Sequence, residues 1–108
     1  MTEVIFFKSA ECSDTLVGFH VYGHSGFADS GEDIVCSAIS SAVIMTANTI
    51  TDIFYARADV SADNDGDVRL MLKEQSEACE KLLQGLKLHL LELEKQYSGF
   101  INVKFTEV

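Results

Sequence analysis

The chain contains no proline and few basic residues: of its 108 residues, 8 are Lys or Arg and 17 are Asp or Glu, a formal net charge of −9. A surface with this excess of negative charge repels phosphate groups, so it disfavours direct nucleic-acid binding and docking on an anionic membrane. A basic protein or peptide is the better-matched partner. Without proline, slow prolyl isomerisation is not expected to limit folding.

Cysteine is scarce, and its spacing excludes two common uses. The three cysteines, Cys12, Cys36 and Cys79, are an odd number and form no C-x-x-C pair. This argues against a disulfide framework and against a structural zinc site, so we expect no metal and no cofactor. It favours a reducing, cytoplasmic compartment. Only four consecutive apolar residues stand near the N-terminus, too few for the core of a signal peptide.

The longest stretch without charge, Ile34 to Thr51, approaches the length of a membrane span. Polar side chains interrupt it throughout, namely Ser37, Ser40, Ser41, Thr46, Asn48, Thr49 and Thr51. We therefore predict a buried helix of a soluble domain. Its inward stripe is predicted to contain Val35, Ala38, Ile39, Ala42, Met45 and Ile53.

The hydrophobic pattern predicts a single α+β domain over residues 1–108, with the order ββαββαβ and two helices packed on a mixed sheet. A turn signal, Asn64-Asp65-Gly66, separates the third and fourth strands. The glycine of Ser98-Gly99 stops the second helix. The expected elements are strands Val4–Lys8 and Thr15–Gly23, helix Ile34–Phe54, strands around Ala58–Ala62 and Val68–Leu72, helix Gln75–Tyr97 and strand Phe100–Val108.

The start of the first helix is where chemistry is expected. If Asp33 is the N-cap, Cys36 is the third helical residue, where backbone N–H groups have no partner within the helix. Those donors and the helix dipole favour a thiolate over a thiol. His24 stands twelve positions earlier, after the second strand, and could serve as the proton partner. The non-catalytic alternative is that Cys36 is a small core residue and that His24 is a solvated loop residue.

Other interpretations of these residues are weaker. The G-x-x-x-x-G spacing of Gly26 and Gly31 matches a phosphate loop, but Glu32-Asp33 follows where Lys and Ser or Thr belong. A thiol-redox protein would need a second cysteine close to Cys36. A zinc set of Cys12, His20, His24 and Cys36 has no support from spacing. A non-catalytic module that holds a basic partner stays open.

Gly23-His24, followed by Gly31-Glu32-Asp33-Ile34-Val35-Cys36-Ser37-Ala38-Ile39-Ser40, resembles the signature of the Prp (YsxB-like) family of ribosomal-processing cysteine proteases. Members typically have Gly-His-Ala, a short loop, and Gly-x-Asp-Ile-Val-Cys-Ala-Ala-(Val/Ile)-Ser. The resemblance extends over the whole chain in length and element order. The chain departs from the pattern at Ser25 and Ser37, which are commonly alanine.

The resemblance implies a homodimeric cysteine endopeptidase of ribosome biogenesis. The alternative is a non-catalytic acidic binding module or ribosome-assembly factor for a basic protein partner. Its substrate would be the precursor of large-subunit ribosomal protein number twenty-seven, whose N-terminal extension is removed after an aromatic residue. Cys36 would be the nucleophile and His24 its proton partner. Asp33 and Ser40 match family positions near the site, and Gly23, Gly26 and Gly31 would shape the loop that admits the peptide.

Overall fold

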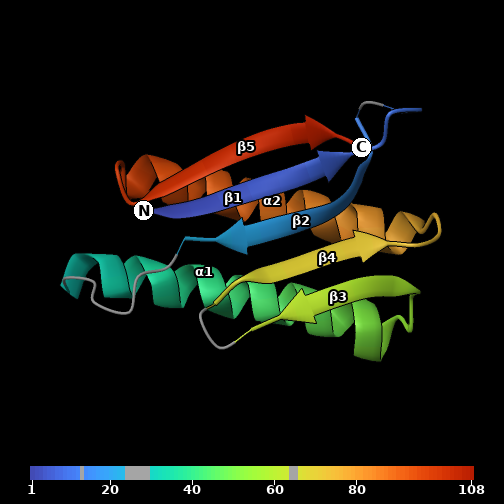
Figure 1. Ribbon diagram of the computed structural model, residues 1–108, viewed down its shortest axis with the longest axis horizontal. Helices are drawn as coiled ribbons and strands as arrows, with labels where there is room; N and C mark the ends of the chain where they lie inside the picture. Colours follow the sequence, from blue (N-terminus) through green and yellow to red (C-terminus); the bar gives the residue numbers. More distant parts are fainter. Residues whose placement is uncertain (13, 24–29, 64–65) are drawn as a thin grey trace.

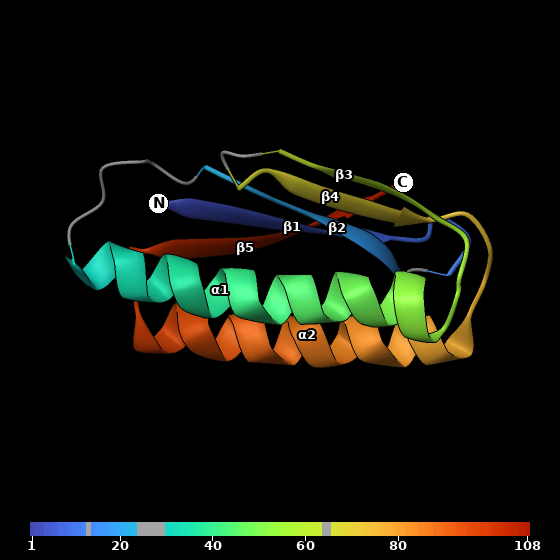
Figure 2. The same cartoon turned by 90° about the horizontal axis from the view of Figure 1, so that it is seen from below.

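A computed structural model describes residues 1–12, 14–23, 30–63 and 66–108. Five strands form one sheet, and both long helices lie against the same face of it (Figures 1 and 2). The predicted α+β class and ββαββαβ order are confirmed. The elements are β1 (Thr2–Lys8), β2 (Leu16–Tyr22), α1 (Ser30–Asn48), a π-helical turn (Thr49–Ile53), β3 (Ala58–Ala62), β4 (Val68–Leu72), α2 (Glu77–Gln96) and β5 (Ile101–Glu107).

The sheet has the strand order β3-β4-β2-β1-β5. β1 pairs antiparallel with β2 and parallel with β5, which makes the sheet mixed. β1 is an interior strand of the sheet, between β2 and β5, and one of its faces is covered by the helices, which is consistent with its run of apolar residues. β2 ends and α1 begins at the same end of the molecule, where β1 and β5 start (Figure 1).

The core lies between the sheet and the two helices. α2 contributes the leucine stripe predicted from its spacing, with Leu83, Leu86, Leu90 and Leu93 buried. Its N-cap is Ser76, whose hydroxyl accepts a hydrogen bond from the amide of Cys79 at 3.2 Å. The other buried core residues are Val4, Phe6, Leu16, Phe19, Val21, Val35, Ile39, Val43, Ile50, Leu70, Cys79 and Ile101.

α1 is buried on one face only, so the expectation that Met45 and Ile53 belong to its inward stripe is wrong. Its inward stripe contains Val35, Ile39 and Val43, whereas Met45 and Ile53 are more than half exposed. Periodicity alone cannot separate the faces of a helix that is apolar all round. The stretch Ile34–Ile53 is long and apolar enough to cross a membrane by length and composition, yet only 28% of it is buried. One face of it packs in the core, and its outer face carries no charge from Ile34 to Thr51, before the exposed Asp52.

Gly18 is required where β2 and β4 meet. A Cβ at this position would lie 2.2 Å from the carbonyl oxygen of Leu70, inside van der Waals contact with rigid backbone. We predict that Gly18→Ala forces the two strands apart and destabilises the fold by about 3 kcal/mol or more. For a domain of this size that corresponds to a Tm roughly 12–24 °C lower, measurable by circular dichroism.

Gly85 provides the matched control for this prediction. It lies within α2, and a Cβ added there would have no atom within 4 Å. Gly85→Ala should stabilise the domain by about 0.5–1 kcal/mol, because it removes a helical glycine without a clash. Equal effects of the two substitutions would show that the Gly18 contact is not the cause.

Candidate active site

Cys36 lies near the start of α1, on the flank of the helix that faces the end of the sheet. Its neighbour Val35 is fully buried, and Ile39 follows one turn later, so the helix is anchored to the sheet on both sides of the cysteine. Cys36 itself is partly exposed. It is therefore not sealed among aliphatic side chains, an environment in which a cysteine is inert.

The sulfur has a specific neighbour on the sheet. Thr2 Oγ1 lies 3.6 Å from Cys36 Sγ, and the Thr2 side chain is almost completely buried. Thr2 is the first residue of β1, where it pairs with Ile101 of β5, and its amide donates to the carbonyl oxygen of Phe100 at 3.0 Å. The nucleophile candidate thus rests against the starting ends of two strands.

The expected N-cap at Asp33 is wrong. α1 begins at Ser30, so Asp33 and Gly31 both belong to its first turn, and Cys36 is the seventh helical residue. Only the first four amides of a helix lack an intrahelical partner. The prediction that Cys36 lies beside the unpaired amides of the helix start is therefore wrong, and these amides do not stabilise a thiolate there directly.

Gly23 fixes the direction in which the chain leaves β2. Its φ of +91° is in the left-handed region that favours glycine, and a Cβ there would lie 2.9 Å from the carbonyl oxygen of Met1. The end of β2 therefore passes against the residue next to Thr2. His24 follows Gly23 in the sequence, but both His24 and Gly26 lie outside the described residues.

Ser40 stands one helical turn after Cys36 and is half-buried. Residues four apart share a helix face, so the structure places Ser40 beside Cys36 on α1. The site as described thus contains Cys36, Ser40 and Thr2, with Gly23 at its border. Among the described residues no group of three or more His, Cys, Asp or Glu side chains could hold a metal ion.

The two remaining histidines lie elsewhere. On β2, His20 faces the side of the sheet away from the helices, where its Nε2 lies 2.7 Å from Asp67 Oδ1 and its ring stacks on Tyr22. His89 is exposed on α2 and lines a groove between the helices together with Ala38. Because Ala38 is two residues beyond Cys36, it points about 200° around the helix from it. Neither histidine is brought to the sulfur.

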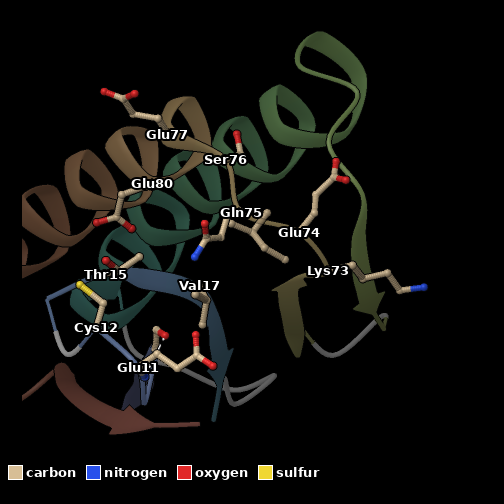
Figure 3. Close-up of a pocket in the computed structure, with 12 residues that line it drawn as sticks. Glu11, Cys12, Thr15, Val17, Lys73, Glu74, Gln75, Ser76, Glu77 and Glu80 are labelled. Atoms are coloured by element: carbon tan, nitrogen blue, oxygen red, sulfur yellow. Dashed lines mark hydrogen bonds between the residues drawn. The ribbon is translucent and has the colours of Figure 1, made fainter.

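A separate pocket of about 440 Å³ lies at the other end of the sheet, beside the N-terminus of α2 (Figure 3). Ser9 in its wall is seven positions after Thr2, about 23 Å of extended chain along β1. The pocket contains the exposed Cys12, but its other ionisable lining residues are glutamates and Lys73, with no histidine to serve as a proton partner. Its lining includes Glu11, Thr15, Val17, Leu72, Lys73, Glu74, Gln75, Ser76, Glu77 and Glu80.

The family model "Cysteine protease Prp" matches residues 1–102 of this chain. The chain belongs to the Prp family of cysteine proteases. A curated relative, the ribosomal processing cysteine protease Prp of Staphylococcus aureus (strain Mu50 / ATCC 700699), is 27% identical over 86 residues, which cover 77% of this chain and 80% of the relative.

Solved structures share the fold of this Prp family member. The crystal structure of SMU.848 from Streptococcus mutans matches with a TM-score of 0.84 and 20% identity, over 100% of this chain and 96% of that one. The essential ribosomal processing protease Prp of S. aureus, in complex with a covalently linked product peptide, matches with a TM-score of 0.84 and 21% identity, over 98% and 100%. The same S. aureus protease with a substrate peptide gives a TM-score of 0.84 and 20% identity, over the same shares.

Sequence reasoning missed Thr2. It is an unremarkable polar residue at the start of a strand, and 34 positions separate it from Cys36. Only the register of β1 in the sheet, together with the packing of α1, brings the two side chains together. A signal for this contact would have required predicting the strand order, which local patterns do not contain.

Proposed function

We propose that this protein is a cysteine endopeptidase in which Cys36 is the nucleophile and His24 its proton partner. The observation that carries the proposal is the position of Cys36: partly exposed, on an anchored helix, at the end of the sheet where β2 leads into His24. Membership of a cysteine protease family supports the same reaction. Asp33 and Ser40 are assigned supporting roles on the helix that holds the nucleophile.

The position of Gly23 supports the assignment of His24. Gly23 packs against Met1, whose neighbour Thr2 contacts the Cys36 sulfur. Gly23, the last described residue before His24, therefore lies at the same end of the sheet as the sulfur. His20 is on the opposite face of the sheet and His89 on the far side of α1, so each would need a different fold to reach Cys36.

The proposed reaction has two stages. The Cys36 thiolate, paired with the His24 imidazolium, attacks the carbonyl carbon of the scissile peptide bond. The tetrahedral oxyanion collapses, His24 donates its proton to the leaving amine, and a thioester between Cys36 and the N-terminal part of the substrate remains. His24 then takes a proton from water, the resulting hydroxide attacks the thioester, and the thiolate is restored.

We propose that the substrate is a basic ribosomal protein precursor, with the precursor of large-subunit protein number twenty-seven as the specific candidate. The net charge of −9 attracts a Lys- and Arg-rich chain and speeds the encounter. The relative from S. aureus is named a ribosomal processing protease, which supports this substrate class. Cytoplasmic location follows as part of the same proposal, because ribosomal precursors are made there.

The test is incubation of the protein with that precursor, followed by intact-mass analysis. Loss of the N-terminal extension by one cut after an aromatic residue is expected. As a matched control, a precursor with that aromatic residue replaced by Gly should be cut at least tenfold more slowly. Binding of the precursor without any change in mass would instead favour a non-catalytic acidic module.

We propose further that the chain forms a homodimer through the outer face of α1. This face contains Ile34, Ile44 and Met45, each more than half exposed, and no charged residue lies between positions 34 and 51. Two copies that each carry a charge of −9 repel one another, and this repulsion is smallest when they meet through an uncharged surface. Beside this face a groove of about 630 Å³ between α1 and α2 can receive side chains of the second copy.

Met45→Glu should weaken the dimer at least tenfold, because it places a charge at the centre of this face and buries it on association. Sedimentation equilibrium of wild type and variant measures the effect. Leu88→Glu is the matched control: Leu88 is similarly exposed, on α2, and does not line the groove. A wild type that is monomeric at tens of micromolar, or a Met45→Glu protein that dimerises like wild type, would overturn this interface.

A further inference from the structure

Thr2 is the side chain that the structure places against the Cys36 sulfur, and neither the family resemblance nor the proposed reaction assigns it a role. Its side chain is 1% exposed, and its hydroxyl oxygen lies 3.6 Å from Sγ. Among the described residues no buried side-chain nitrogen or oxygen lacks a hydrogen-bond partner, and Cys36 is the partner found for the Thr2 hydroxyl. The contact with the sulfur therefore gives the buried Thr2 hydroxyl a hydrogen-bond partner at the edge of the apolar core.

We propose that Thr2 is a positioning residue for the nucleophile: its hydroxyl donates a hydrogen bond to the Cys36 sulfur and holds it as an anion in one orientation. The inference rests on the proposed role of Cys36 as a nucleophile. The direction of the bond depends on the state of the sulfur. A thiol can donate or accept, but a thiolate has no proton, so the Thr2 O–H must then be the donor.

The surroundings of Thr2 make its hydroxyl a rigid donor. Its backbone is held on the β5 side by pairing with Ile101 and by the bond to the Phe100 carbonyl oxygen. A β-branched side chain has a restricted χ1, so the buried hydroxyl has little freedom to turn away. Because α1 starts at Ser30 and its open amides lie before Cys36, this hydroxyl supplies a stabilisation that the helix terminus does not supply directly.

Hydrogen bonds to charged groups are stronger than those to neutral groups. The Thr2 hydroxyl should therefore raise the fraction of Cys36 that is thiolate at a given pH. Once all of the sulfur is ionised, the hydroxyl should change the alkylation rate little. This separates it from a structural role, which would change the reactivity of Cys36 at every pH.

The experiment measures the rate of Cys36 alkylation by iodoacetamide between pH 5 and 9, with the site mapped by mass spectrometry, in the full chain without substrate. In Thr2→Val, which keeps the shape and loses the hydroxyl, the midpoint of the pH profile should move up by about one unit. The rate on the high-pH plateau should stay within about twofold of wild type. Thr2→Ser, which restores the hydroxyl, should return the midpoint to the wild-type value.

Thr46→Val is the matched control. Thr46 is also a buried threonine, on α1, but its hydroxyl donates to the carbonyl oxygen of Ala42 at 2.8 Å instead of to the sulfur. Its midpoint should equal that of wild type. A Thr2→Val midpoint equal to wild type, or an equal shift in Thr46→Val, would overturn the proposal.

If Thr2→Val does not fold, the pair Thr2→Ala and Thr2→Ser tests the same hydroxyl, because both fill less space than threonine. A midpoint that is the same in both variants would overturn the proposal. No substrate takes part in these measurements. A protein that cleaves no ribosomal precursor but shows the shift would therefore refute the proposed substrate and leave the role of Thr2 standing.

Discussion

Cys36→Ala should abolish proteolysis of the ribosomal precursor, with a loss of roughly 10⁴-fold or more in kcat/KM. The reason is chemical: an alanine methyl group cannot attack a carbonyl carbon, and no second cysteine can replace it. Cys79 is completely buried on α2, and Cys12 lies beyond the other end of β1. Cleavage is followed by intact mass, and binding of the uncleaved precursor by calorimetry should persist.

The fold of this variant should be nearly unchanged, because Cys36 is only partly buried and alanine is a good helix former. Cys12→Ala is the matched control, since it removes an exposed thiol from the same chain and should leave cleavage within about twofold of wild type. Residual cleavage by Cys36→Ala above a tenth of the wild-type rate would refute a nucleophilic role for this sulfur.

His24→Ala should lower turnover by about 10²–10⁴-fold, the usual contribution of a general acid–base group. Without the imidazole the leaving amine has no proton donor, and water must attack the thioester unaided. Single-turnover kinetics with the precursor measures both steps. KM should change much less than kcat, because the side chain acts on the reacting atoms rather than on remote binding.

The control for this prediction is His20→Gln. His20 bonds to Asp67 on the open face of the sheet, and glutamine retains a donor for that carboxylate. Turnover should stay within about twofold of wild type. If His20→Gln impaired turnover while His24→Ala did not, the base would be on the wrong face of the sheet for the proposed reaction, and the account of the site would be wrong.

Most of the fold could be predicted from the sequence because its patterns are local. Alternating and continuous apolar runs located the five strands, and the leucine spacing of α2 defined its buried face. The turn signal at Asn64-Asp65-Gly66 predicts the antiparallel pairing of β3 and β4, which is confirmed, while Asn64 and Asp65 themselves lie outside the described residues. In each case the deciding residues are neighbours in the chain.

The predictions that are wrong or missing concern features that residues close together in the sequence do not determine. Asp33 is a good N-cap residue type, but acidic residues are also favourable within the first turn of a helix, which is where α1, beginning at Ser30, places it. On α1 and the π-helical turn after it the apolar residues occur on every face, so the prediction that Met45 and Ile53 lie in the core is wrong. The contact between Thr2 and Cys36 depends on strand order, which no local pattern encodes.

The central claim is that the Cys36 sulfur is an activated nucleophile, and competition among the three cysteines for iodoacetamide at pH 6 tests it most directly. Exposure alone would rank Cys12 first, Cys36 second and Cys79 last. An activated thiolate predicts the alkylation of Cys36 ahead of the more exposed Cys12, as mapped by mass spectrometry. Alkylation of Cys12 first, with Cys36 reacting only above pH 8, would contradict the account.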